Sequence, residues 1–177
     1  MEKGSRLKDY ELALQWLLDC GLLYKVKHVS KPSLPLISYE TDFFKVYIND
    51  VGLLCTKAGL DLKTLLHGNR IFEEFKGALT EQYVLQEMVA NGIIPFYWSS
   101  NGKAEVDFII KYESDVFPLE VKAEENLQSK SLRSYSEKYN PAVALRTSMR
   151  DYRRESWLIN IPLYAIGTGF SKAINDL

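Results

Sequence analysis

The stretch PLEVKA, residues 118–123, decides the fold class of this chain. In a β-strand, residues two apart project from one face, so Glu120 and Lys122 share a face while Leu119 and Val121 turn toward packing. The carboxylate can hold a hard divalent cation, and the lysine offers a positive charge to a phosphate or to an activated water. Taken alone, the same pattern is also typical of an ordinary solvated strand face. The neighbouring predicted elements are therefore needed to decide between the two interpretations.

A second strand, AEVDFII at residues 104–110, precedes the first. Alternation places Glu105 and Asp107 on one face, and the turn at 113–115 predicts a hairpin that brings Asp107 beside Glu120. Two adjacent carboxylates repel each other unless a cation lies between them, and Mg²⁺ is the usual solution. We expect Glu105 to be a polar partner rather than a ligand.

A long helix is predicted before these strands, at residues 73–91, and it ends at Asn91-Gly92. It carries Glu81, with Gly77 one turn earlier as a place of close approach. With the elements that follow, the second half reads α-β-β-β-α-β plus an extra strand. This order predicts an α/β (α+β) fold with a mixed central sheet flanked by helices. The other predicted elements are strands at 93–98, 116–123, 141–147 and 157–167, the last an edge strand because of Pro162, and a helix at 127–139.

The front of the chain predicts a separate small unit of the winged-helix type, incomplete at its start. We expect a largely buried helix followed by a hairpin, a strand and a short helix. The boundary is placed near residues 60–72, which gives a region 1–65 and a domain 66–177. The predicted elements are a helix at 7–23, strands at 22–29, 36–40 and 43–48, and a helix from Asp50 to Gly59.

The composition is that of a folded protein with a sizeable core. Of 177 residues, 46% are hydrophobic, and the net charge is −1, so any contact with nucleic acid needs a local basic surface. No apolar run approaches the length of a membrane span, and no signal pattern or P-loop motif occurs, which predicts a cytoplasmic protein without membrane contact. Cys20 and Cys55 are expected to be buried free thiols, and His28 and His67 are given no role.

The arrangement of GxxxE in a helix, a strand bearing Asp and a strand bearing ExK resembles the PD-(D/E)XK nuclease superfamily. A closer resemblance is to the uncharacterised C-terminal domain of bacterial and archaeal AAA-type ATPases. It covers nearly the whole chain, including the front half, where it resembles a winged-helix linker. The stretches that carry it are GALTEQYVLQEM (77–88), YWSSNGKAEVDFII (97–110), PLEVKA (118–123), IPLYAIG (161–167), ALQWLLDCGLL (13–23) and FKVYINDVGLL (44–54).

This resemblance implies roles for four residues. Asp107 and Glu120 would be metal ligands, Glu81 an accessory ligand, and Lys122 the residue that positions water or stabilises charge on the phosphate. The metal would be Mg²⁺ or Mn²⁺, and ATP would enter only through an N-terminal ATPase domain that this chain does not contain, which suggests a fragment or a truncated relative. The family often has an arginine where this chain has Ser99, which puts a phosphate contact there in doubt.

Two functions are expected for such a chain. One is a metal-dependent nuclease acting on DNA or RNA, and the other is a non-catalytic module of the ATPase that binds nucleic acid or a protein. An oligomerisation or regulatory domain is a third, weaker alternative, and the oligomeric state stays open. A basic stretch at 126–154 carries +5 and can line a phosphate backbone or be a solvated surface; its basic residues are Lys130, Arg133, Lys138, Arg146, Arg150, Arg153 and Arg154.

Overall fold

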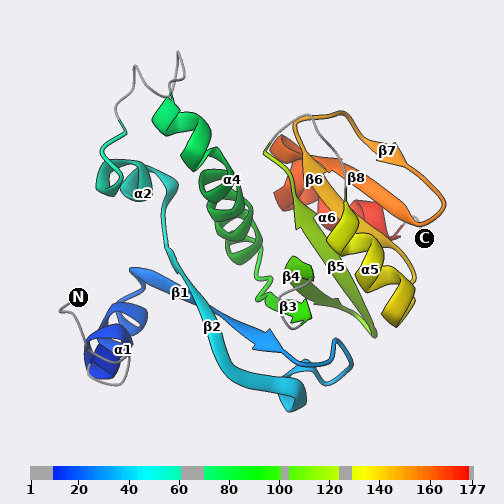
Figure 1. The fold of residues 1–177 in the computed structure, drawn as a ribbon, viewed down its shortest axis with the longest axis horizontal. Coiled ribbons are helices and arrows are strands. Elements are labelled where there is room, and N and C mark those ends of the chain that lie inside the picture. The colour runs from blue at the N-terminus through cyan, green and yellow to red at the C-terminus, as the bar shows by residue number, and fades with distance from the viewer. Residues whose placement is uncertain (1–9, 61–69, 101–103, 124–128, 176–177) are drawn as a thin grey trace.

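A computed structural model describes residues 10–60, 70–100, 104–123 and 129–175 of the chain. It is a mixed α/β structure, and its described residues form an eight-stranded sheet in the order β2-β1-β3-β4-β5-β6-β8-β7 (Figure 1). The helices are α1 (Glu11–Asp19), α2 (Val51–Lys57), α4 (Arg70–Ala90), α5 (Lys130–Tyr139) and α6 (Ile166–Asn175). The strands are β1 (Leu23–Val29), β2 (Glu40–Ile48), β3 (Phe96–Ser100), β4 (Ala104–Tyr112), β5 (Asp115–Val121), β6 (Ala144–Ser148), β7 (Arg153–Arg154) and β8 (Leu158–Pro162).

The centre of the sheet follows the predicted order. Strands β3, β4 and β5 are antiparallel neighbours, and Phe108 pairs with Leu119 in the expected hairpin. Helix α5 then crosses to β6, which lies parallel to β5, and β8 lies parallel to β6. Pro162 ends β8, which lies between β6 and the two-residue β7, so the prediction of an edge strand is wrong.

Two hydrophobic cores cover the two faces of this sheet, because alternate strand residues turn to opposite sides. Phe108 and Leu119 belong to the core that contains residues of α4 and α6, while Ile109 belongs to the core that contains residues of α5. Helix α6 was not predicted from the sequence. It buries Ile166, Phe170, Ala173 and Ile174.

The front hairpin extends the sheet. Strand β1 pairs antiparallel with β2 and parallel with β3, where His28 is opposite Tyr97. His28 is buried, and its Nε2 accepts a hydrogen bond from the Ser99 N–H at 3.2 Å, which leaves Nδ1 to donate to Thr41 Oγ1 at 3.0 Å. The side chain therefore has a structural role that the sequence did not reveal.

Several expectations for the front of the chain are wrong. The predicted strand at 36–40 is mainly a 3-10 helix, η2 (Leu36–Tyr39), and β2 begins at Glu40. Helix α1 has no buried residue, and Trp16 is 67% exposed. Cys20 is exposed, while Cys55 is buried as expected.

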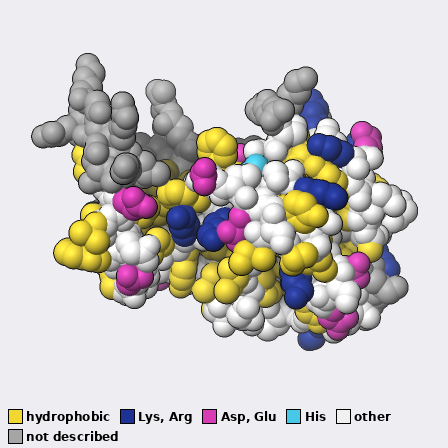
Figure 2. All heavy atoms as spheres, turned by 90° about the horizontal axis from the view of Figure 1, so that it is seen from below, with side chains coloured by type: hydrophobic (Ala, Val, Ile, Leu, Met, Phe, Trp, Pro, Cys, Tyr) yellow, Lys and Arg dark blue, Asp and Glu magenta, His cyan; other side chains and the backbone are white. Residues whose placement is uncertain are grey.

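Hydrophobic side chains are exposed among basic and acidic ones on the face of the molecule shown in Figure 2. No helix in the described part of the chain is long and apolar enough to cross a membrane. The predicted boundary between residues 65 and 66, and His67, lie outside the described residues.

Candidate carboxylate site

Asp107 lies at an irregularity of β4. On the β3 side, Trp98 is paired with Val106 and Phe96 with Ile109, so β4 has one extra residue between the two pairs, a β-bulge. On the β5 side, Asp107 Oδ2 accepts a hydrogen bond from the Val121 N–H at 2.7 Å. At this bulge, the carboxylate of Asp107 on β4 therefore reaches the backbone of β5.

The electrostatic surroundings of Asp107 are unfavourable to its negative charge. Burial raises the pKa of this carboxyl, and the nearby carboxylates of Glu81 and Glu120 raise it further. The hydrogen bond from Val121 and the ammonium of Lys45 act in the opposite direction, and the net pKa is about 7. Near neutral pH the group is therefore poised between its protonated and ionised forms.

Glu120 is the most deeply buried of the predicted site residues, at 6% exposure. Its Oε1 lies 2.9 Å from the Nζ of Lys122, as the same-face spacing predicted. Its Oε2 is buried and has no hydrogen-bond partner among the described residues. A buried carboxylate oxygen without a partner is costly, and a hard cation or a ligand proton at this atom would satisfy it.

Glu81 is held by the front hairpin. Its Oε1 accepts hydrogen bonds from the Tyr47 hydroxyl and from Lys45 Nζ, the latter at 3.3 Å. Lys45 Nζ also lies 2.6 Å from Glu105 Oε1, so Glu105 is a polar partner, as expected. Burial raises the pKa of Tyr47 strongly, and the charge of Glu81 adds to this, so Tyr47 remains a hydrogen-bond donor.

Sequence reasoning did not find Lys45 and Tyr47. The two residues share one face of β2, since they are two apart in the strand, and that spacing was visible in FKVYI. Nothing local indicated that this face would meet a helix more than thirty residues later. Two further hydrogen bonds join α4 to this part of the chain. Gln82 donates to the carbonyl of Ile48 at the end of β2, and the N–H of Val51 at the start of α2 donates to Gln86 at 3.0 Å.

The predicted site residues lie in one region of the structure, but they contact different partners. Asp107 is electrostatically coupled to both Glu81 and Glu120. Glu81, however, forms its hydrogen bonds with β2, and Glu120 forms an ion pair with Lys122. Within the described residues there is no group of three or more His, Cys, Asp or Glu arranged to hold a metal ion. The oxygen donors suit Mg²⁺ or Mn²⁺, and the unpartnered Glu120 Oε2 is the atom that best fits a cation.

The prediction that Gly77 permits a close approach is wrong. A Cβ at this position would meet no heavy atom of the described residues within 4 Å. Gly77 precedes Glu81 by one turn of α4, so the approach of β2 to Glu81 does not depend on the missing side chain.

Two family models match the chain. One covers residues 1–64 and is described as a domain of unknown function (DUF8612). The other covers residues 76–165, just over half of the chain. No curated protein and no solved structure gave a match. The chain therefore belongs to the family described as a domain of unknown function (DUF4143).

Proposed function

We propose that this chain binds a divalent metal ion at Asp107 and Glu120 and uses the site to hydrolyse phosphodiester bonds of DNA or RNA. The observation that carries the proposal is the buried Glu120 Oε2, which lacks a partner while the other oxygen of the same carboxylate meets Lys122. The resemblance to PD-(D/E)XK nucleases in GxxxE, Asp and ExK supports it. The resemblance to C-terminal domains of AAA-type ATPases supports an ATPase domain as a partner.

The residues present define the roles in this proposal. Asp107 and Glu120 would hold Mg²⁺ or Mn²⁺, which when bound polarises a phosphate and lowers the pKa of a water. Lys122, partly exposed beside Glu120, would orient the water or face the charge that develops on the phosphate. Lys45 and Tyr47 would position Glu81 rather than touch the substrate.

A second candidate function is a non-catalytic module that binds nucleic acid or a protein. The observation that favours it is the engagement of Glu81 by Lys45 and Tyr47, which neutralises one of the three predicted ligands without a metal ion. In this case the carboxylates and Lys45 serve to hold the hairpin against α4. A fold-level likeness does not decide between these functions.

Titration calorimetry with Mn²⁺ and a cleavage assay on single- and double-stranded DNA and RNA test the proposal together. We expect binding at millimolar Mn²⁺ or below, and cleavage that Glu120→Gln and Lys122→Gln each reduce by about 100-fold or more. Glu137→Gln, an exposed carboxylate on α5, is the matched control and should cut normally.

The outcomes separate the two functions. Cleavage that persists unchanged in Glu120→Gln and Lys122→Gln would overturn the assignment of these residues. Metal binding without cleavage would retain the metal site and favour the binding module. Failure to bind Mn²⁺ at millimolar concentration would overturn the metal site itself.

A further inference from the structure

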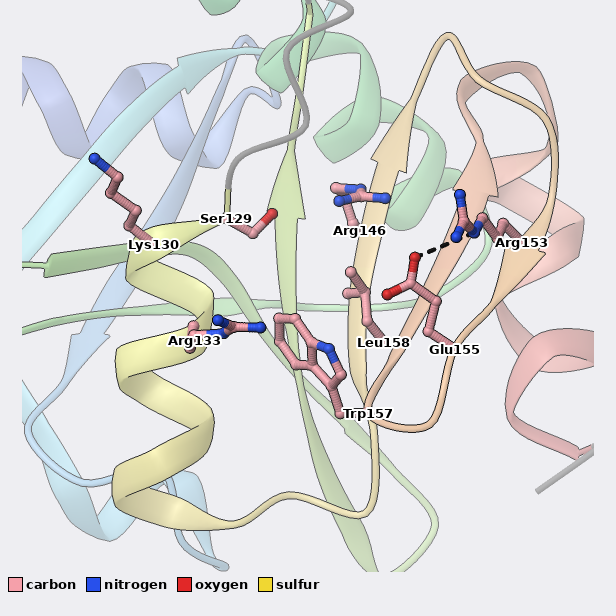
Figure 3. Close-up of a pocket in the computed structure, with 8 residues that line it drawn as sticks. All are labelled: Ser129, Lys130, Arg133, Arg146, Arg153, Glu155, Trp157 and Leu158. Atoms are coloured by element: carbon pink, nitrogen blue, oxygen red, sulfur yellow. Dashed lines mark ion pairs between the residues drawn. The ribbon is translucent and has the colours of Figure 1, made fainter.

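A basic cavity lies beside α5, near the edge of the sheet formed by β6, β8 and β7 (Figure 3). Its volume is about 590 Å³, which lies within the range of small-ligand sites. The described residues that line it include four cationic side chains and one carboxylate, in a chain whose net charge is −1. The lining residues are Ser129, Lys130, Arg133, Arg146, Arg153, Glu155, Trp157 and Leu158.

Arg146, which lines this cavity from β6, is held by a buried polar network. Its side chain is 5% exposed, and its Nε donates to Asn160 Oδ1 at 3.0 Å. The Nδ2 of Asn160 donates to the carbonyl oxygens of Arg150 and Asp151, and Ser148 Oγ donates to the same Oδ1 at 2.8 Å. Asn160 thereby fixes the position of the guanidinium.

Burial disfavours the charge that Arg146 carries. It lowers the pKa of the guanidinium, although the carboxylates of Glu155 and Glu120 act in the opposite direction. Arginine remains charged at any pH that the protein tolerates, so this cost is present in the folded protein. Arg146 thus contributes a fixed positive charge to the lining of the cavity.

The wall of the cavity combines a cation with a flat aromatic ring. The guanidinium of Arg133 lies 5.3 Å from the centre of the Trp157 ring. Figure 3 shows that both side chains lie on the same side of the cavity, with Arg133 extending from α5. Aromatic rings and guanidinium planes are the surfaces on which nucleobases stack, while arginine and lysine bind phosphate oxygens.

The opposite wall of the cavity contains Arg153, but the positive charge of this residue is partly offset by a neighbouring carboxylate. Arg153 Nε lies 3.2 Å from Glu155 Oε1, so this arginine is partly neutralised within the cavity (Figure 3). Lys130 and Arg133, both exposed on the first turns of α5, therefore carry the accessible positive charge. An anionic ligand would meet Lys130 and Arg133 on α5 and Arg146 on β6.

We propose that this cavity binds a nucleoside monophosphate, with its phosphate toward Lys130, Arg133 and Arg146 and its base against Trp157. The nucleotide can be free or can form the phosphorylated end of a nucleic-acid strand, since both present the same phosphate and ring. The site does not require a metal ion, so it goes beyond the proposed hydrolytic function and is testable without it.

The test is titration of the full chain in EDTA with four probes: adenosine 5′-monophosphate, adenosine, inorganic phosphate and a 5′-phosphorylated oligonucleotide. Calorimetry gives affinity, and tryptophan fluorescence reports contact with Trp157. We expect the monophosphate to bind at least about tenfold more tightly than adenosine or phosphate, because both halves of the ligand are recognised. The oligonucleotide compared with its 5′-hydroxyl form shows whether a strand end binds too.

Arg133→Gln should weaken monophosphate binding by about tenfold or more, and Trp157→Phe should abolish the fluorescence change. Lys172→Gln, an exposed cation on α6, is the matched control and should bind like the wild type. Circular dichroism checks that each variant is folded.

Equal affinity for phosphate and monophosphate would overturn the assignment of a nucleoside ligand. Unchanged affinity in Arg133→Gln, or no binding of any probe at millimolar concentration, would overturn the site. Because these measurements are made without metal, their failure leaves the proposed hydrolytic site untouched, and failure of hydrolysis leaves this site untouched.

Discussion

The carboxylate of Asp107 accepts a hydrogen bond from the backbone N–H of Val121, at 2.7 Å, where the regular pairing of β4 with β5 ends. The acceptor for the Val121 N–H is therefore a side-chain carboxylate, where a regular strand pair would use a backbone carbonyl. Asp107 therefore has a structural role as well as its proposed metal-binding role. Variants at this position need to keep a hydrogen-bond acceptor if the two roles are to be separated.

Asp107→Asn keeps an acceptor and removes the charge. In the unfolded chain this carboxyl ionises near its ordinary pKa of 3.8, and in the folded protein near 7. The contribution of the protonated Asp107 carboxyl to the free energy of unfolding is therefore complete below about pH 4 and is lost as the pH rises to about 7. We expect metal-free Asp107→Asn to match the wild type near pH 4 and to be more stable by about 1–3 kcal/mol at pH 8. Urea unfolding in EDTA measures this; a difference that does not vary with pH would contradict it.

Lys45→Gln removes a cation that would compete with a metal ion at the proposed site for the carboxylates. Lys45 Nζ lies 2.6 Å from Glu105 and 3.3 Å from Glu81. We expect Mn²⁺ affinity to rise about three- to tenfold, measured by calorimetry, and the stability of the metal-free protein to fall. The control is Lys25→Gln, because Lys25 lies over the ring of Phe44 on the same hairpin. Mn²⁺ affinity that falls or stays the same would show that Lys45 does not compete.

Lys122→Met leaves the buried Glu120 carboxylate without the cation that meets its Oε1. Breaking one side of a mostly buried ion pair is costly, and we expect a loss of about 1–3 kcal/mol in the free energy of unfolding. Adding Glu120→Gln should recover part of this loss, and Lys111→Met on the exposed side of β4 should have little effect. Double-mutant analysis of urea unfolding gives the coupling, and additive effects would contradict the pair.

Asn160→Ala should be the most destabilising of these changes. Asn160 is 2% exposed and bonds to Arg146, Ser148 and two backbone carbonyls. Removing it leaves several buried polar groups unsatisfied, and we expect a loss of about 2–4 kcal/mol. Thermal and urea unfolding measure it. Asn175→Ala is the control, because among the described residues the exposed Asn175 side chain accepts a single hydrogen bond, from the Tyr112 hydroxyl. A loss below about 1 kcal/mol would mean that the network rearranges around the gap.

The central hairpin was predictable because its signal is local. Alternation in AEVDFII and PLEVKA, with a short turn between them, fixed the neighbours Phe108 and Leu119 and the shared face of Glu120 and Lys122. The bulge at Asp107 was not predictable, because it depends on the register with β3.

Other features of the structure were not predicted from the sequence for different reasons. Helix α6 has apolar residues at the helical positions Ile166, Phe170, Ala173 and Ile174, but Gly167, Gly169 and the preceding strand-like run obscured this pattern. The exposure of Trp16 and Cys20 could not be inferred from an apolar helix alone, since burial depends on what the rest of the fold brings near it. The same is true of the contact between Lys45 and Glu81.

The hydrogen bonds between the front hairpin and α4 have a practical consequence for expressing parts of this protein. A fragment limited to residues 76–165 would leave Glu81, Gln82 and Gln86 without their partners on β2 and α2. It would also remove the whole of α6 and uncover the apolar core beneath it. Such a fragment is expected to aggregate, and a loss of activity in it would say nothing about the carboxylates. The smallest informative protein spans both matched segments and continues through α6.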